Sequence, residues 1–409
     1  MKLTYRPEID GLRAIAVGAV ILYHTEISIL GHQPFKGGFI GVDIFFVISG
    51  YLISSIILKE LVTTGSFSFK HFYERRIRRI LPVLLFVMLA SIPFAWMYFL
   101  PSDLLDFSKS ILYSIGFSSN FYFHYSGLEY SVEGLRHPFL HTWSLSVEEQ
   151  YYILFPIILL ITFKYFQKYL IGILIIGFFI SLSFAEWTSR NYLSVSFYFL
   201  HTRMWELLAG SILAYFEITK GHRSQNKGLN LILPFIGLIL IGHSIVFFND
   251  EMFHPSFYTL SPIIGVCLII WFSNKKEIIT KILSTKLFVG IGLISYSLYI
   301  WHYPIFVFTA KLNLTEGDIL KKLLIAIFII ILSIVSYYFV EKPFRNTKIK
   351  FKKILIFLFL KSLLISSICI YFLNLNFHPF LTKYSNENEN FELNYYYKNF
   401  SNKKNVFII

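Results

Sequence analysis

Long apolar runs alternate with short basic segments along most of this 409-residue chain. The runs hold roughly 17–25 residues, the length that an α-helix needs to cross the hydrocarbon core of a bilayer. The composition agrees, because 55% of the residues are hydrophobic and only 15% are charged. The sequence therefore predicts an all-α fold, a polytopic membrane helix bundle. Clear examples of the runs are 81–100, 153–163 with its flanks, 229–248, 287–310 and 320–340.

The basic segments predict the topology, because cytoplasmic loops of membrane proteins concentrate Lys and Arg. This rule also explains the formal net charge of +13 without a nucleic-acid partner. If all of these segments face the cytoplasm, an even number of crossings separates each from the next. The segments lie at 2–6, 59–79, 164–168, 220–227, 275–286 and 342–353.

One weak candidate lies between two of these segments, at 104–123. It contains Asp106, Lys109 and several serines. We therefore expect a surface or re-entrant helix there rather than a span, which keeps the parity. About ten transmembrane helices then precede the basic segment at 342–353, and an eleventh follows it.

The chain is expected to have three parts: a membrane domain at 1–346, an additional transmembrane helix at 347–373 and a short external tail at 374–409. The tail is too short for a core of its own and is expected to be mostly disordered. No signal-peptide cleavage pattern follows the first apolar run. Cys267 and Cys369 both lie inside apolar runs, so neither a disulfide nor a metal site is expected.

The first apolar run, GLRAIAVGAVILYHTE, carries Arg13 near one end and His24 near the other. In a helix the two lie about 16 Å apart along the axis and just over three turns apart, so they share a face. Polar residues inside membranes are costly, and functional use is the default interpretation. Two alternatives remain open: an interface arginine paired with Asp10, and a structural interior histidine.

The segment HFYERRIRRILP places Arg75, Arg76 and Arg79 at i, i+3 and i, i+4 spacing. One helix face can therefore present several guanidiniums, whose geometry matches phosphate oxygens. A phosphorylated cytoplasmic ligand is one interpretation. A simple positive-inside anchor is the other.

Histidines and carboxylates gather toward the opposite ends of the runs. In HTWSLSVEEQYY, Ser146 and Glu149 fit a capping box, which is a structural interpretation of Glu149. Glu148 shares a face with His141, Ser144 and Tyr152 if that helix starts early. Such residues suit a reaction or a transport path between the two sides. Further candidates are Asp43, Glu206, which follows Arg203, and His302.

Several motifs in series resemble the acyltransferase family 3, membrane-bound enzymes that O-acylate bacterial surface polysaccharides. The resemblance extends from Tyr5 to about Asn346. The motifs are YRPEIDGLRAIAV with Arg13-x10-His24, GGFIGVDIFFVISGYLI, FYERRIRRILP, HTWSLSVEEQYYILFP, SYSLYIWHYPI and YFVEKPFRN.

The resemblance implies an acyltransferase for groups other than aminoacyl groups, in the bacterial inner membrane. The acyl donor would be acetyl-CoA or another short acyl-CoA, used as co-substrate with no bound cofactor. The acceptor would be a hydroxyl of a cell-surface glycan, such as a lipopolysaccharide O-antigen or an exopolysaccharide. Many members carry an SGNH-hydrolase-like domain after an eleventh helix, so a separate domain of that kind is a candidate partner.

The same resemblance suggests a role for each residue type. Arg75, Arg76 and Arg79, with Arg13, would bind the acyl-CoA phosphates. His24 would act as general base on the acceptor hydroxyl, because imidazole titrates near neutral pH, and Glu148 would orient or charge-stabilise it. A covalent acyl-histidine is an open alternative. A transporter of a small anionic or acylated solute, with these residues as a relay, is the rival class.

Overall fold

The computed structural model describes residues 5–28, 32–126, 137–314 and 319–375, and these residues are mostly helical. Eight helices in this part of the chain are long and apolar enough to cross a membrane. The predicted all-α polytopic bundle is therefore confirmed. The eight begin and end as follows: α2 (Gly41–Thr64), α3 (Phe69–Tyr98), α6 (Thr142–Tyr165), α7 (Leu170–Asn191), α10 (Lys227–Phe247), α13 (Lys286–Lys311), α14 (Ile319–Ser336) and α16 (Phe351–Asn374).

Three more helices lie alongside these eight: α1 (Pro7–His24), α9 (Leu200–Lys220) and α11 (Leu260–Phe272). α1 and α9 hold several charged residues, and α11 has only 13 residues, so composition sets the first two apart from the eight and length sets α11 apart. With these three, described helices lie at the positions where the sequence predicts ten crossings and an eleventh, and eight of them meet the length and hydropathy of a span. The predicted tail at 374–409 lies almost entirely outside the described residues.

Short elements connect the long helices. They are α4 (Pro101–Ile115), α5 (Ser119–Tyr125), α8 (Leu193–Tyr198), α12 (Ile278–Leu283), α15 (Lys342–Phe344), the 3₁₀ turns η1 (Lys36–Ile40), η3 (Gln167–Tyr169) and η4 (Phe257–Thr259), and a π-helical segment, η5 (Tyr337–Glu341).

The weak candidate at 104–123 forms two short helices, α4 and α5, rather than one span. The chain turns between them at Phe117, which has a positive φ of 50°. α4 packs against α3 and α16, and its buried serines bond back to their own helix or to Thr142. The prediction that this segment does not cross is consistent with its length.

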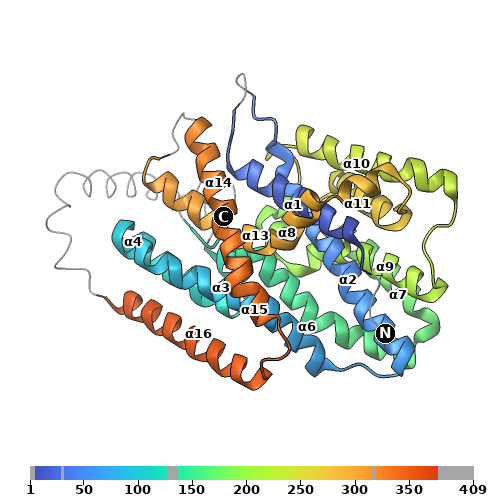
Figure 1. Ribbon diagram of the computed structural model, residues 1–409, viewed down its shortest axis with the longest axis horizontal. Helices are drawn as coiled ribbons and strands as arrows, with labels where there is room; N and C mark the ends of the chain where they lie inside the picture. Colours follow the sequence, from blue (N-terminus) through green and yellow to red (C-terminus); the bar gives the residue numbers. More distant parts are fainter. Residues whose placement is uncertain (1–4, 29–31, 127–136, 315–318, 376–409) are drawn as a thin grey trace, which may run out of the picture.

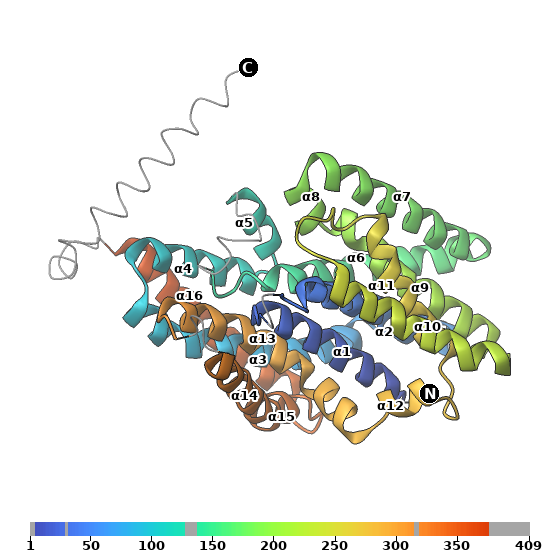
Figure 2. The ribbon, with the colours of Figure 1, turned by 90° about the horizontal axis from the view of Figure 1, so that it is seen from above.

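Helix α1 lies in the middle of the bundle and packs against α2 and α13 (Figure 1). On one side of it α2 pairs with α9, α9 with α7, and α10 with α11 (Figure 2). On the other side α16 lies at the edge of the bundle, against α3 and α4 (Figure 1). The α2–α9 contact is especially close. A Cβ added to Gly50 would lie 1.9 Å from the Leu207 carbonyl oxygen, and one on Gly210 would lie 2.0 Å from that of Val47. Only glycine fits at either position.

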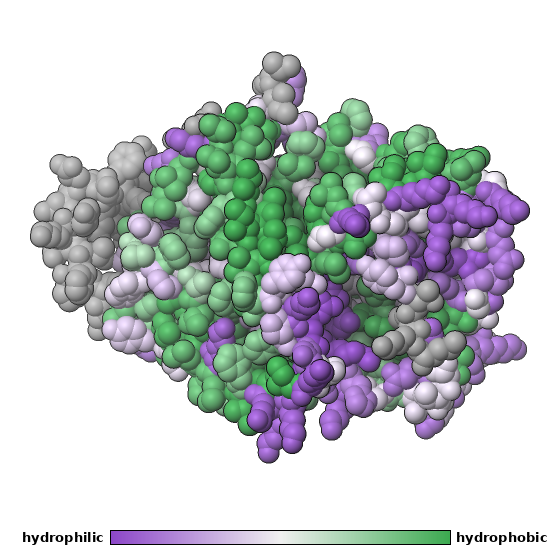
Figure 3. Space-filling view, viewed as in Figure 1, coloured by the Kyte–Doolittle hydropathy of each residue, from purple (hydrophilic) through white to green (hydrophobic). Residues whose placement is uncertain are grey.

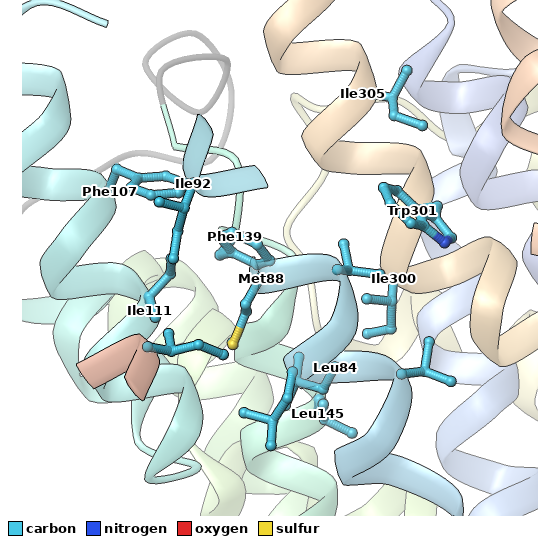
Figure 4. Close-up of a cluster of buried hydrophobic side chains, with 14 of the residues drawn as sticks. Leu84, Met88, Ile92, Phe107, Ile111, Phe139, Leu145, Ile300, Trp301 and Ile305 are labelled. Atoms are coloured by element: carbon cyan, nitrogen blue, oxygen red, sulfur yellow. The ribbon is translucent and has the colours of Figure 1, made fainter. Parts of the chain in front are cut away.

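An apolar cluster joins α3, α4 and α13 (Figure 4). Met88 and Leu84 of α3 are fully buried between Phe107 of α4 and Ile300 of α13. The one polar atom of the Trp301 side chain is satisfied, because its Nε1 donates to Ser336 Oγ at 2.7 Å. This packing fixes α13, which carries several residues of the site.

The bundle has two chemically different ends. The end where α1 begins and α2 and α9 finish, here called the basic end, exposes Lys220, Gln225 and Lys227. The opposite end, here called the His24 end, is where α1 finishes and α2 begins. Hydrophilic side chains gather along the right and lower edges in Figure 3, whereas green apolar surface covers most of the rest of this face.

Candidate active site

Helix α1 carries its two ionisable residues at different depths of the bundle. Arg13 Nη1 lies 3.1 Å from Asp10 Oδ1, so the i, i+3 ion pair of the structural alternative for Arg13 is present. His24 ends the helix, and its Nδ1 lies 2.8 Å from the Val20 carbonyl oxygen. A carbonyl can only accept, so Nδ1 carries the proton and the neutral ring keeps its lone pair on Nε2. His24 is therefore set up as a base through Nε2.

Rings from α13 and from the start of α6 surround His24. Its ring centroid lies 5.2 Å from that of His302 and 5.0 Å from that of Tyr303. His302 lies 5.4 Å from His141 and 5.3 Å from Tyr299, by the same measure. The structure thus brings the predicted residue His302 next to His24, in one cluster of histidines and tyrosines.

A cavity of about 220 Å³, here called the histidine cavity, opens beside His24. Its wall includes Tyr23, Glu26, Asp250 and Tyr303 besides His24. The Tyr23 hydroxyl donates to Asp250 Oδ1 at 2.7 Å, which ties α1 to the loop between α10 and α11. This cavity is at the His24 end of the bundle.

A second cavity, here called the arginine cavity, lies between α1, α2, α3, α6 and α13 and has a volume of about 90 Å³. Arg13, Arg76 and Arg79 all line it, together with Glu148 and Tyr299. The guanidinium Nε of Arg76 is buried and has no hydrogen-bond partner among the described residues. An unsatisfied donor of a permanent cation marks this cavity as a site for an anionic or carbonyl oxygen.

Two larger cavities at the basic end meet this arginine cluster. One, of about 1140 Å³, is lined by Arg13 and Arg79 and by further cations such as Lys59. The other, of about 490 Å³, is lined by Arg75, Arg76 and Arg79. Arg79 therefore borders all three basic cavities, and the four predicted arginines occupy one connected region.

The remaining arginine of the HFYERRIRRILP motif has a structural part. Arg78 is buried and pairs with Glu74 at 2.8 Å. It also donates to the carbonyl oxygens of Phe344, Asn346 and Ile349, the last at 2.7 Å. It thereby fastens the start of α3 to the segment before α16.

Glu148 lies in the arginine cavity, where the Ser49 hydroxyl donates to it. The other side of that cavity holds Tyr299, whose hydroxyl exchanges a 2.6 Å hydrogen bond with Ser144. Glu148, Ser144 and Tyr152 do share a face of α6, as predicted for an early helix start. The described contacts of Glu148 are with the arginine region rather than with His24, so the predicted role of orienting His24 gains no support from this arrangement.

The predicted capping box is wrong. α6 begins at Thr142, four residues before Ser146, so Ser146 lies inside the helix. Its hydroxyl instead accepts from the backbone N–H of Ser119 at 3.2 Å and bonds the Ser119 hydroxyl. Glu149 is left buried, and its Oε1 has no hydrogen-bond partner among the described residues.

Asp43 and Glu206 belong to a separate buried cluster around Arg203. Arg203 Nη1 lies 2.8 Å from Asp43 Oδ1 and 3.2 Å from Glu206 Oε1, and all three side chains are fully buried. The guanidinium also lies over the rings of Trp143 and Phe197, at 5.2 and 5.1 Å. Neither carboxylate lines the cavities described above, so this cluster fastens α2 to α9.

Sequence reasoning missed His254, which completes the cluster from the loop between α10 and α11. Burial lowers the pKa of His254, with Asp43 acting in the opposite direction. The neutral ring can donate from Nε2 to Asp43 Oδ2 at 2.9 Å, while Nδ1 accepts from Arg203 at 3.4 Å. No periodic pattern marks a single loop histidine, so no signal in the sequence could have found it.

Glu341 was also missed, although it belongs to the quoted YFVEKPFRN motif. It ends the π-helical segment η5, is buried, and accepts from Ser297 Oγ at 3.0 Å. Arg345 lies 3.3 Å from its other oxygen. A π-helical turn redirects side chains relative to an α-helix, which heptad or 3.6-residue counting cannot anticipate.

The comparison with family models gives one match, to the acyltransferase domain of family 3, over residues 6–342. The chain belongs to this acyltransferase family. The match covers the helices that carry the arginine cavity, the histidine cavity and the Arg203 cluster.

Curated relatives agree with the family. The chain is similar to the peptidoglycan O-acetyltransferase OatA of Listeria monocytogenes, with 35% identity over 358 residues, 84% of this chain and 56% of the relative. It is 31% identical over 366 residues to the O-acetyltransferase OatA of Staphylococcus aureus strain NCTC 8325, 85% of this chain and 58% of the relative. The chain thus spans little more than half the length of these relatives. No solved structure matches.

Proposed function

We propose that this protein moves an acetyl or other short acyl group from cytoplasmic acyl-CoA to a hydroxyl of a cell-surface glycan. One observation carries the proposal: the single helix α1 places Arg13 in the arginine-lined cavities and His24 in a cavity at the other end of the bundle. A helix with a binding residue at one end and a base at the other suits a reaction whose two substrates arrive from opposite sides of a membrane. Peptidoglycan, the substrate named for the Listeria relative, is one candidate acceptor.

The donor would enter at the basic end, which we assign to the cytoplasm on the positive-inside rule. Arg75, Arg76 and Arg79 would bind the CoA phosphates by paired hydrogen bonds. The thioester sits at the end of the long, flexible pantetheine arm. It can therefore lie deeper than the phosphates, in the direction of Arg13 and His24.

In the transfer step, His24 Nε2 would take the proton of the acceptor hydroxyl. The acceptor oxygen would then bond to the thioester carbonyl carbon, and the carbon–sulfur bond would break to release CoA as its thiolate. The proton held by His24 can return to the thiolate, so atoms and charge balance. The unsatisfied Nε of Arg76 is suited to hold a phosphate oxygen of the donor while this step takes place.

Replacing Arg76 with lysine should weaken acyl-CoA binding roughly 10-fold or more, because lysine keeps the charge but loses the paired donors. Isothermal titration with acetyl-CoA on protein in nanodiscs measures this. Arg190→Lys is the matched control, since Arg190 is half exposed and pairs with Glu186 away from the cavities. Equal acetyl-CoA affinity for wild type and Arg76→Lys would contradict phosphate binding and would leave the arginine motif only the role of fixing the topology.

The proposed orientation predicts that Arg75 and Glu251, both exposed, face opposite sides of the membrane. Cysteines placed at these two positions, in a background with Cys267 and Cys369 changed to alanine, should react with an impermeant maleimide from opposite sides. Labelling in intact cells and in inverted vesicles measures this. Labelling of position 75 in intact cells would reverse the assignment of donor and acceptor ends.

The function itself is tested by consumption of acetyl-CoA in purified protein, measured with a panel of glycans and lipid-linked sugars. A parallel measurement of solute flux in proteoliposomes separates transfer from transport. Acyl transfer to at least one glycan is expected. Flux without release of CoA would overturn the proposal in favour of a transporter.

A further inference from the structure

We propose that the histidine cavity is a saccharide subsite, in which the carboxylates of Glu26 and Asp250 bind one uncharged sugar ring of the acceptor. The inference rests on the proposed function, because it assigns the acceptor side of that reaction. The cavity volume of about 220 Å³ is many times the roughly 10–15 Å³ that a single water needs by the same measure, so the cavity suits one sugar ring.

The wall of the cavity offers the contacts that a sugar ring uses. Among the described hydrogen bonds, Asp250 accepts at Oδ1 from Tyr23, at 2.7 Å, which leaves Oδ2 for a ligand. Glu26 supplies a second exposed carboxylate. Carboxylates accept strong hydrogen bonds from hydroxyl and amide donors. The buried ring of Tyr303 adds an apolar surface for the C–H face of the sugar.

The charge of the cavity indicates which sugars fit. Two carboxylates, Glu26 and Asp250, and one lysine, Lys36, line the cavity, and Lys322 reaches the Glu26 carbonyl oxygen from outside the wall. The fixed charges therefore balance, and neither a phosphate nor a uronate group would meet an excess of positive charge there. We therefore assign the subsite to a neutral hexose or N-acetylhexosamine.

The backbone at Glu26 has an unusual conformation for a glutamate. Glu26 follows the end of α1 with a positive φ of 48°, in the left-handed region where glycine is favoured. Its carbonyl oxygen accepts from Lys322 Nζ at 2.9 Å, which holds the turn in place. A glutamate kept in such a conformation costs stability relative to glycine.

The subsite also places the substrate for the reaction. His24 lines the same cavity, and its lone pair is on Nε2, as argued above. A sugar ring bound by Asp250 and Glu26 would lie against the imidazole, with a hydroxyl within reach of the base.

The test uses the full chain in nanodiscs, with acetyl-CoA as donor and N-acetylglucosamine tetrasaccharide as the neutral acceptor probe. Asp250→Asn and Glu26→Gln should each raise the KM for the tetrasaccharide roughly 10-fold, while the KM for acetyl-CoA is unchanged. Glu251→Gln is the matched control, because it alters the neighbouring exposed carboxylate of the same loop, which is not part of the cavity wall. Its KM should equal that of wild type.

Glu26→Gly separates ligand binding from structure. Glycine adopts a positive φ without strain, so the melting temperature should rise by roughly 1–2 °C. The KM for the tetrasaccharide should nevertheless rise as in Glu26→Gln. A purely structural Glu26 would give an unchanged or lower KM in the glycine variant, and that would contradict the proposal.

The possible outcomes distinguish this proposal from the proposed function. If wild type consumes no acetyl-CoA with any acceptor, the proposed function fails. If wild type transfers acetyl groups but Asp250→Asn and Glu26→Gln match Glu251→Gln in acceptor KM, the subsite is overturned and the function stands. Transfer to a uronate oligosaccharide in preference to the neutral tetrasaccharide would overturn the subsite as well.

Discussion

Replacing His24 with alanine is expected to lower acyl transfer roughly 10²–10⁴-fold, the contribution typical of a positioned general base. The reason is the hydrogen bond from Nδ1 to the Val20 carbonyl oxygen, which keeps the basic lone pair on Nε2. Initial rates of CoA release with saturating donor and acceptor measure the loss. Acetyl-CoA affinity should stay near wild type, because the phosphate-binding arginines lie at the opposite end of α1.

Two companion variants make this result interpretable. His243→Ala removes an exposed histidine of α10 and should leave turnover unchanged. Arg13→Ala should weaken donor binding with little effect on acceptor binding, since Arg13 lies about 16 Å from His24 along the helix. Near wild-type turnover in His24→Ala would move the base elsewhere, and His302, in the same ring cluster, would become the next candidate.

Replacing Asp43 with alanine is expected to destabilise the fold by about 3–5 kcal/mol, because it leaves the fully buried Arg203 without its closest carboxylate. Glu206 alone lies farther away, at 3.2 Å. His254 would lose its acceptor at the same time. The measurement is the midpoint of thermal unfolding in detergent, with Asp43→Asn as a milder variant that keeps the volume of the side chain.

The matched control for Asp43 is Asp106→Ala. Asp106 pairs with Lys109 at 3.6 Å, but both side chains are more than two-fifths exposed. Exposed pairs contribute about 0–1 kcal/mol, so this variant should unfold near the wild-type temperature. Equal midpoints for Asp43→Ala and Asp106→Ala would contradict a stabilising role for the buried cluster.

The sequence allowed most of the helices to be predicted, because the bilayer demands long apolar runs. Even α1 was predicted despite its charges, since an apolar run separates Arg13 from His24. The segment at 104–123 was excluded as a span for the right reason: its serines and charges leave too little apolar length. These features are local, and each can be derived from neighbours in the chain.

Contacts between distant segments could not be derived in this way. Ser146 looked like a cap because Glu149 follows at the right spacing, yet its hydroxyl bonds Ser119, and the packing of that serine is visible only in three dimensions. The resemblance suggested Glu148 as a partner of His24, whereas rotation about the axis of α6 directs it to Ser49. The depth of a residue along its helix follows from counting residues. Which side chain of another helix it contacts depends on how the helices pack.

The glycine contact between α2 and α9 limits how this protein can move. With Gly50 and Gly210 each pressed against the partner's backbone, a slide of one residue would bring a side chain where only a hydrogen fits. The hydroxyls of Ser54 and Ser211, 2.7 Å apart, add a polar bond across the same seam. The two helices therefore form one rigid body, which also contains Asp43 and Arg203. Any conformational change that admits substrates must therefore move other helices relative to the α2–α9 pair. Distances measured from this pair would report such a movement.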